Sequence, residues 1–322
     1  MCILNENEYK IFEQLTTLNQ KGTIQAMSTF LNNNYKEVVT TSKYIYAIGD
    51  IPIALTAHMD TVFKSPPKNI YYDEKKNVIW SPEGLGADDR AGIFAIIKII
   101  LSGFKPHIIL TTDEERGALG ASVLVKKVNK PFADMKYIIQ LDRRGDNDCV
   151  FYDCDNKEFV NYIEKFGFIE NIGSFSDIST ICPSWEVAGV NLSVGYQNEH
   201  SVSETLHITP FLNTVNKVIE MLKDVNNIST FKYVHNNKIN SLLKNIDWNS
   251  INTFYKCHGC GTAWSEYELF PVKCRDGKKH FYCPDCIVDN VDWCIVCGQP
   301  FEVGKNKNQN ICDDCSRGNK NV

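Results

Sequence analysis

The chain has 322 residues, of which 43% are hydrophobic and 23% are charged. A chain of this size and composition can bury one large core or two unequal ones, which excludes a disordered peptide and a disulfide-stapled miniprotein. The formal net charge of −5 argues against a broad basic surface for nucleic acid or for an anionic membrane.

No segment of the sequence suggests a membrane span or an export signal. The longest apolar run, residues 93–101, is interrupted by Lys98 and is far shorter than the roughly 20 residues that span a bilayer. The first ten residues mix Asn and Glu and do not resemble a signal peptide. We therefore expect a cytoplasmic protein without a membrane anchor.

The predicted elements alternate between strands and helices after an all-helical start. Two amphipathic helices are predicted between residues 8 and 34, with Gly22 and Thr23 ending the first and starting the second. Strands are predicted over 44–48 and 53–57, followed by a hairpin over 70–80 that turns at 74–77. Further helices are predicted over 91–101, 120–128, 157–166 and 209–225, and further strands over 107–111, 137–141 and 190–194. This alternation predicts an α/β fold, a three-layer sandwich whose mostly parallel central sheet is covered by helices.

The chain changes character after residue 225. Residues 226–256 contain eight asparagines and little periodicity except around 239–243, which predicts a linker with one short helix. We expect one domain over residues 1–225 and a second, Cys-rich domain over residues 257–322.

Five clusters of acidic or histidine side chains lie just beyond predicted strands or just before a predicted helix. They are His58 with Asp60, Asp88 with Asp89, the run Asp113, Glu114 and Glu115, then Asp142, and finally His200. In a parallel sheet ligands gather at the carboxyl ends of the strands, and adjacent like charges there are unfavourable unless cations offset them. Carboxylate oxygens and imidazole nitrogens bind zinc, and two ions about 3.5–4 Å apart can share a carboxylate. The clusters together predict a metal site.

The motifs that carry these residues resemble a known superfamily. His-Met-Asp-Thr-Val at 58–62, Gly-Ala-Asp-Asp-Arg-Ala-Gly at 86–92 and Asp-Glu-Glu at 113–115 are similar to the co-catalytic di-zinc exopeptidases, which include peptidase T, carboxypeptidase G-type enzymes and single-domain bacterial aminopeptidases. The likeness is closest to the peptidase T branch and covers roughly residues 8–225. It implies a zinc metallopeptidase, most similar to aminopeptidases, that cleaves a peptide or N-acyl amino-acid amide bond with a metal-bridging water.

The resemblance also implies a ligand set. His58 and Asp142 would hold one zinc ion, Glu115 and His200 would hold the other, and Asp88 would bridge the two. These are the expected co-catalytic metal ligands.

Two other acids are implied to act beside the ligands. Asp60 would accept the second N–H of His58 and so determine its tautomer, and Glu114 would be the general base. The resemblance further implies a cis peptide bond between Asp88 and Asp89.

One departure from the peptidase T pattern concerns the lid domain that those enzymes insert between the last two ligands. The interval from Asp142 to His200 is 200 − 142 = 58 residues, so we expect no lid insertion. Contacts to the substrate and to the developing oxyanion would then come from elsewhere, with Tyr196, Arg143 or Arg144 as candidates. Each of these three residues has an ordinary alternative, namely packing for the tyrosine and solvation or ion pairing for the arginines.

Nine of the thirteen cysteines follow residue 256. Eight of them form four C-x-x-C knuckles: Cys257/Cys260, Cys283/Cys286, Cys294/Cys297 and Cys312/Cys315. This spacing predicts two structural Cys₄ zinc sites in a double zinc ribbon, in addition to the two co-catalytic zinc ions, and it favours a reducing compartment. Sequential pairing of the knuckles is favoured over cross-brace pairing, which stays open. Cys274, His258 and His280 are nearby potential ligands that we expect to be bystanders.

The Cys-rich domain has no basic excess. Residues 257–322 hold eight Lys or Arg against nine Asp or Glu, a difference of −1, so nucleic acid is not an expected partner. The aromatic and apolar residues of this domain either pack on its small core or form a face for a protein partner, and the composition leaves both open. Two alternatives to a peptidase remain: an inert peptidase-like protein whose zinc ribbons bind other proteins, and an amidohydrolase of a non-peptide substrate.

Overall fold

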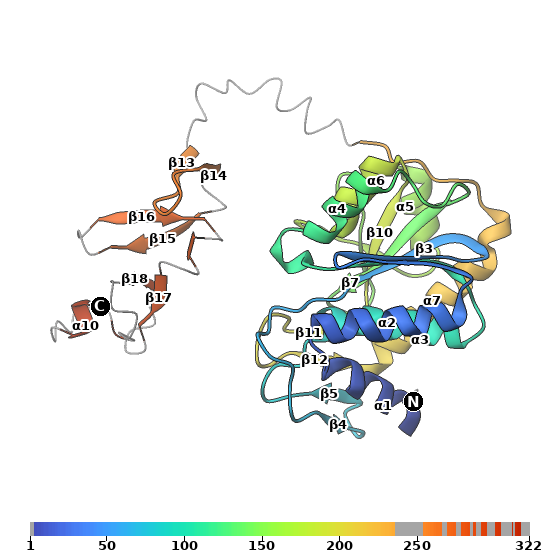
Figure 1. Ribbon diagram of the computed structural model, residues 1–322, viewed down its shortest axis with the longest axis horizontal. Helices are drawn as coiled ribbons and strands as arrows, with labels where there is room; N and C mark the ends of the chain where they lie inside the picture. Colours follow the sequence, from blue (N-terminus) through green and yellow to red (C-terminus); the bar gives the residue numbers. More distant parts are fainter. Residues whose placement is uncertain are drawn as a thin grey trace. The chain divides into compact units, whose positions relative to one another are not determined.

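The computed structural model describes residues 3–235, 254–265, 269–274, 278–283, 286–287, 291–294, 300–303, 311 and 313–316. The chain divides into two compact units, Met1–Asn237 and Lys238–Val322 (Figure 1). The first unit extends past the expected boundary at residue 225, because Phe231 is buried in the core and its backbone is hydrogen-bonded to Lys136 and Ala188. The helix predicted around 239–243 lies outside the described residues.

The first unit is built on an eight-stranded sheet with the order β1-β2-β6-β3-β7-β10-β8-β9. Its strands are β1 (Glu37–Thr40), β2 (Tyr44–Ile48), β3 (Ile51–His58), β6 (Pro106–Thr111), β7 (Tyr137–Arg143), β8 (Asp148–Val150), β9 (Ile169–Glu170) and β10 (Gly189–Ser193). The four central strands β6, β3, β7 and β10 are parallel neighbours, whereas β1, β2 and β8 pair antiparallel. The central strands are almost continuously apolar and buried, as expected for parallel strands covered on both faces.

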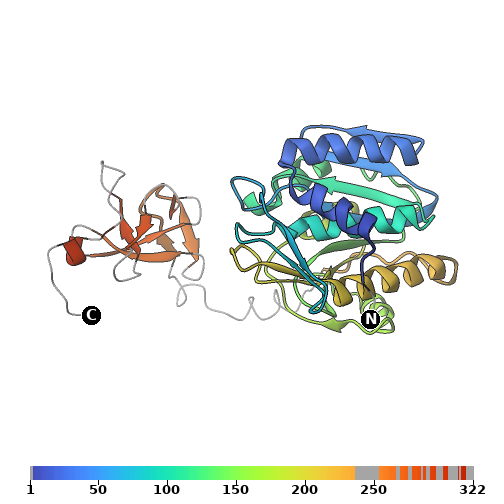
Figure 2. The same cartoon turned by 90° about the horizontal axis from the view of Figure 1, so that it is seen from below.

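Seven α-helices belong to this unit: α1 (Glu6–Thr16), α2 (Gln20–Asn34), α3 (Ala87–Leu101), α4 (Leu119–Lys127), α5 (Lys157–Glu164), α6 (Asp177–Trp185) and α7 (Ile208–Lys223). Helices α4 and α6 pack together on one face of the sheet, and α3 packs with α1 and α7 on the other (Figure 1). Figure 2 shows α2, α3 and α7 within this second layer. The predicted three-layer α/β architecture is confirmed.

The predicted break between the first two helices was misplaced. Helix α1 ends at Thr16 and α2 begins at Gln20, so Gly22 lies inside the first turn of α2. The side chain of Asn19 caps α2 by accepting the N–H of Gly22 at 2.9 Å. The capping hydrogen bond, rather than the glycine, determines where the helix starts.

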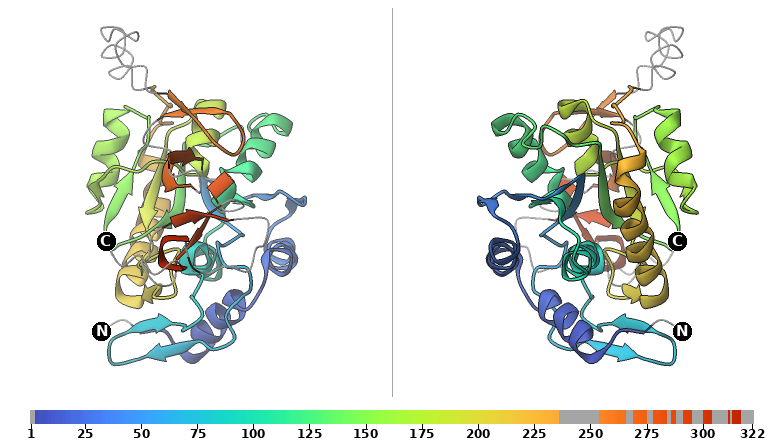
Figure 3. Two further views of the ribbon diagram at one scale, coloured as in Figure 1. Left: turned by 90° about the vertical axis from the view of Figure 1, so that its left-hand side faces the viewer. Right: turned by 90° about the vertical axis from the view of Figure 1, so that its right-hand side faces the viewer.

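A second, four-stranded sheet has the order β11-β12-β5-β4. Strands β4 (Tyr71–Asp73) and β5 (Val78–Trp80) form the predicted hairpin, and β11 (Tyr196–Gln197) and β12 (Thr205–His207), from much later in the chain, join it through the pairing of β12 with β5. The hairpin lies beside α1 (Figure 3), where the rings of Tyr9 and Tyr72 stack with centroids 5.6 Å apart. The loop between β11 and β12 carries His200, so this small sheet positions one of the expected metal ligands.

The second unit contains short strands and one described helix. Its strands are β13 (Phe254–Lys256), β14 (Ala263–Ser265), β15 (Phe270–Lys273), β16 (Lys279–Tyr282), β17 (Val291–Trp293) and β18 (Pro300–Glu302), and its helix is α10 (Asp313–Ser316). Strands β13 and β14 pair with each other, and the others form a sheet with the order β16-β15-β18-β17. Across the described residues of both units, no helix is long and apolar enough to cross a membrane.

Candidate metal centres and active site

The carboxyl ends of three neighbouring parallel strands carry the expected ligands of the first unit. His58 is the last residue of β3, Asp142 lies near the end of β7, and Glu115 follows β6 in the 3-10 helix Glu114–Arg116. Asp88 lies at the N-terminal end of α3, and His200 approaches from the β11–β12 loop. The parallel arrangement of β6, β3 and β7 is what brings side chains from distant stretches of the chain to one edge.

The five side chains form two groups that share Asp88. The Nε2 atom of His58 lies 3.0 Å from Oδ1 of Asp88 and 3.5 Å from Oδ1 of Asp142. The Nε2 atom of His200 lies 3.2 Å from Oδ2 of Asp88 and 3.0 Å from Oε1 of Glu115. In each group the potential ligand atoms lie within 4.8 Å of one another. The two oxygens of Asp88 therefore face two different imidazoles, which is the arrangement of a bridging ligand.

The electrostatics of this edge favour positive charge. Asp88 and Glu115 raise the pKa of His200 to about 11. Burial lowers the pKa of His58, but Asp142 and the other surrounding carboxylates raise it well above its usual value. In the described part of the chain, the ion pairs of Asp88 and Asp142 are made with these two histidines alone. A set of carboxylate oxygens and imidazole nitrogens that attracts cations in this way fits two zinc ions.

Asp60 contacts both groups of potential metal ligands, through the ring of His58 and through the backbone of Glu115. Its Oδ1 lies 3.3 Å from Nδ1 of His58, and its carboxylate accepts the backbone N–H groups of Glu114 and Glu115 at 3.1 and 3.2 Å. The same carboxylate thus orients the imidazole and holds the loop that carries Glu115.

Glu114 lines a pocket of about 320 Å³ that opens onto the metal ligands. Burial raises the pKa of its carboxyl group to about 9, and the negative charge of Asp142 adds to the effect. A raised pKa favours proton uptake by this carboxyl group, which is one half of the role of a general base.

The three residues proposed to contact substrate line the same pocket. Tyr196 is buried, and its hydroxyl donates to Oδ1 of Asp142 at 3.3 Å. Arg143 and Arg144 follow Asp142 directly and form part of the wall. The first unit contains no lid between Asp142 and His200; strands β8, β9 and β10 and helices α5 and α6 fill this fully described interval.

The peptide bond between Asp88 and Asp89 is cis, as the resemblance implied. Asp89 does not face the imidazoles; its carboxylate accepts the backbone N–H groups of His58 and Gly92 at 3.1 and 2.9 Å. The two adjacent acids therefore have different environments.

Glu204 is a site residue that the sequence reasoning missed. Its buried carboxylate accepts the backbone N–H groups of three successive residues, Gly86, Ala87 and Asp88, the last two at 3.1 Å. Glu204 thus holds the loop that presents the bridging carboxylate. The only signal in the sequence is its position four residues after His200, which does not by itself indicate a contact with residues 86–88.

A further buried acid, Asp177, lies at the start of α6 near Glu114. Ser176 is the N-cap of α6, and Asp177 is its first residue, fully buried, with its carboxylate accepting the hydroxyl of Thr111. Burial raises the pKa of Asp177 to about 7. It adds to the negative surroundings of Glu114.

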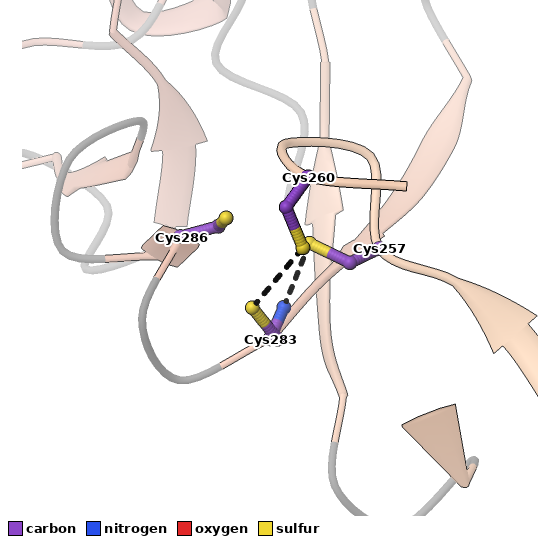
Figure 4. Close-up of side chains that lie close together, drawn as sticks. All are labelled: Cys257, Cys260, Cys283 and Cys286. Atoms are coloured by element: carbon purple, nitrogen blue, oxygen red, sulfur yellow. Dashed lines mark hydrogen bonds between the residues drawn. The ribbon is translucent and has the colours of Figure 1, made fainter. Parts of the chain in front are cut away.

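A second potential metal centre lies in the C-terminal unit, where four thiols meet (Figure 4). The sulfur atoms of Cys257, Cys260, Cys283 and Cys286 lie within 4.8 Å of one another. Cys257 follows β13 and Cys283 follows β16, and the N–H of Cys283 donates to Sγ of Cys257 at 3.3 Å. This grouping corresponds to sequential pairing of the first two knuckles.

The other knuckles are described only in part. Cys294 is buried and Cys315 is half-buried, whereas Cys297 and Cys312 lie outside the described residues. Near the first cluster, the rings of His258 and His280 stack with centroids 3.9 Å apart. Sγ of Cys274 lies 3.8 Å from the hydroxyl of Tyr282.

Comparisons with known proteins agree with this geometry. The model of peptidase family M28 matches residues 40–165, a range that contains His58, Asp88, Glu115 and Asp142. No curated protein sequence matches the chain.

Among solved structures, an aminopeptidase PepT from Bacillus cereus is 16% identical, with 70% of this chain and 99% of that chain covered and a TM-score of 0.57. A tripeptidase from Staphylococcus aureus is 15% identical, with coverages of 70% and 100% and a TM-score of 0.58. A TET aminopeptidase from a marine sediment thaumarchaeote is 14% identical, with coverages of 68% and 97% and a TM-score of 0.53. These likenesses show a shared fold. The family model matches less than half of the chain, and together with the motifs it supports a metallopeptidase.

Proposed function

We propose that the first unit is an exopeptidase, most similar to aminopeptidases, that hydrolyses a peptide or N-acyl amino-acid amide bond with a water shared by two zinc ions. One observation carries this proposal: the two oxygens of Asp88 face two imidazoles, and each imidazole has a carboxylate of its own. A single structural ion would need only one of these groups.

The proposed ligands form two sets, one for each zinc ion, which correspond to the two groups of neighbouring side chains. His58 and Asp142 would hold one ion, Glu115 and His200 the other, and Asp88 both. Two zinc ions bound there would polarise the scissile carbonyl and lower the pKa of the shared water.

Glu114 is the proposed general base. Its position in the pocket, next to Glu115, allows its carboxylate to accept a proton from the attacking water and to return that proton to the leaving nitrogen. Asp60 does not itself line the pocket, and its proposed role is to orient His58 and the Glu114 backbone.

For the C-terminal unit we propose structural zinc and a protein-binding role. Eight cysteines in four knuckles supply two Cys₄ sites, of which the group Cys257, Cys260, Cys283 and Cys286 is assembled in the described residues. Such a site stabilises a segment too small to have a large core of its own. Thiolates remain available for zinc in a reducing compartment, which supports the cytoplasm as the location.

The test of the general base is Glu114→Gln in the full-length, zinc-loaded protein. Wild type and variant are assayed on a panel of aminoacyl, carboxy-terminal and acyl-amide substrates, with zinc content measured by mass spectrometry and with the exposed Glu158→Gln in α5 as the charge-matched control. We expect about four zinc ions per chain in all three proteins and turnover reduced at least about 100-fold in Glu114→Gln alone. A zinc-loaded Glu114→Gln variant with wild-type turnover would contradict the assignment.

A further inference from the structure

The active-site pocket is lined by arginines as well as by acidic groups. Arg143 and Arg144 are the arginines among its lining residues, and both follow the ligand Asp142 directly. The two arginines differ in how their charges are compensated.

Arg144 already has a partner. Its Nη1 lies 2.7 Å from Oε1 of Glu199, within the range of a charge-assisted hydrogen bond, and its side chain is 64% exposed. This charge is largely neutralised before any substrate arrives.

Arg143 is compensated much less well. Its side chain is only 14% exposed, yet its closest carboxylate oxygen, Oδ2 of Asp148, is 3.4 Å from Nη2, longer than the usual 2.7–2.9 Å of such pairs. That same oxygen accepts a better hydrogen bond from Asn171, at 2.9 Å. Its other contact, to the carbonyl oxygen of Ile172, is also 3.4 Å long, and within the described chain its buried Nε has no hydrogen-bond partner. A guanidinium offers five N–H donors, so most of the capacity of Arg143 is unused.

An apolar surface lies next to this guanidinium. Ile172 is 89% exposed and Phe175 is 44% exposed, and both line the same pocket on the segment that Arg143 contacts. An under-bonded cation beside apolar side chains suits a ligand group with a carboxylate and an apolar side chain on neighbouring atoms.

We infer that Arg143 binds the free carboxylate of the substrate, so that the preferred substrates are dipeptides or N-acyl amino acids with an apolar C-terminal residue. Arg143 lines the same pocket as the proposed metal ligands, and the free carboxylate of such a substrate belongs to the residue that is released as the leaving group. The inference rests on the proposed function and narrows it to short substrates. The side chain of Arg143 acts in substrate binding and belongs to the catalytic unit itself.

The experiment compares alanyl-leucine with alanyl-leucinamide, following release of alanine by zinc-loaded wild type, Arg143→Gln and Arg143→Lys. Lys36→Gln, which removes an exposed charge between α2 and β1, is the control. A hydrogen bond to a charged group changes affinity by a factor of about 10 or more. We therefore expect the kcat/KM of wild type to be at least about tenfold higher for alanyl-leucine than for alanyl-leucinamide. Arg143→Gln should lose that preference mainly through KM for the acid, with the amide little affected, Arg143→Lys should recover part of it, and the control should keep it.

The outcomes separate the inference from the function on which it rests. If wild type cleaves both substrates equally, or if Arg143→Gln keeps the preference, the carboxylate assignment is wrong while the peptidase function stands. If wild type cleaves neither substrate nor any member of the wider panel, the proposed function fails, and calorimetric binding of leucine against leucinamide decides the role of Arg143. Leucine binding that weakens in folded Arg143→Gln supports the inference, and binding that does not depend on Arg143 overturns it.

Discussion

Replacing Glu204 with glutamine tests how the bridging carboxylate is held in place. The carboxylate of Glu204 is buried and receives three backbone N–H groups, two on Oε2, from Gly86 and Ala87, and one on Oε1, from Asp88. Glutamine has a single acceptor oxygen, so its amide NH₂ must face at least one of these N–H groups. The substitution changes little in volume and directly removes an acceptor.

The magnitude follows from those contacts. One buried donor without an acceptor costs about 1–3 kcal/mol, and the two remaining hydrogen bonds lose the charge that makes them roughly twice as strong as neutral ones. Because relief of the buried charge offsets part of this loss, we expect the free energy of unfolding of the metal-free protein to fall by about 2 kcal/mol. The loop that presents Asp88 should also loosen, so binding of the active-site zinc ions should weaken by about tenfold or more.

Two measurements check this expectation at pH 8. Burial raises the pKa of Glu204 to about 7, so the side chain is mostly ionised at that pH. Urea unfolding of the metal-free protein gives the stability change, and competition with a chelator gives zinc affinity, with Glu158→Gln as the control. Should Glu204→Gln match wild type in both measurements, the three N–H contacts would not hold the loop as we argue.

Three further changes have expected outcomes in other parts of the chain. Burial lowers the pKa of His107, whose Nδ1 accepts the N–H of Gly49 at 3.1 Å, so the folded state keeps it neutral while the unfolded state protonates below about pH 6.5. The free energy of unfolding should therefore fall as the pH decreases through this range, and it should fall less in His107→Asn than in wild type. Urea unfolding at pH 7.5 and 5.5 checks this, and an equal loss in the two proteins would contradict it. Gly92→Ala would place a methyl group against the carbonyl oxygen of Leu141, and we expect a loss on the order of 3 kcal/mol in urea unfolding, whereas an unchanged midpoint would show that the contact adjusts freely. Cys286→Ser should lower zinc content by one ion per chain while peptidase activity persists, and an unchanged zinc count would remove the cluster from the list of metal sites.

The part of the fold that the sequence predicted well is the part with strong local patterns. The central strands are continuous apolar runs, and their alternation with amphipathic helices predicted a parallel sheet. From that prediction alone, the clusters that contain His58, Glu115 and Asp142 were expected to meet, since the carboxyl ends of parallel strands share an edge. The family resemblance then singled out these three residues as ligands. The structure places all three there.

The features that the sequence did not reveal depend on long-range contacts or weak local signals. Strands β1, β8 and β9 were not predicted, because they are short strands at or next to the edges of the sheet, without a clear apolar pattern. Helix α6 was not given bounds, and it contains Pro183, a residue that usually argues against a helix. The contact between Glu204 and Gly86 spans 118 residues and joins a side chain to backbone N–H groups, for which no residue pattern exists.

The two proposed ions depend on different parts of the fold. His58 and Asp142 both come from the central sheet, so one group is held by the most buried strands of the molecule. His200 comes from the loop between β11 and β12, whose place depends on the pairing of β12 with β5 in the small second sheet. Because Glu204 lies in that same loop and holds the residues around Asp88, the chain ties the less rigid group to the bridging ligand by hydrogen bonds that do not involve metal. The loop that supplies His200 therefore also determines where the carboxylate shared by both ions can lie.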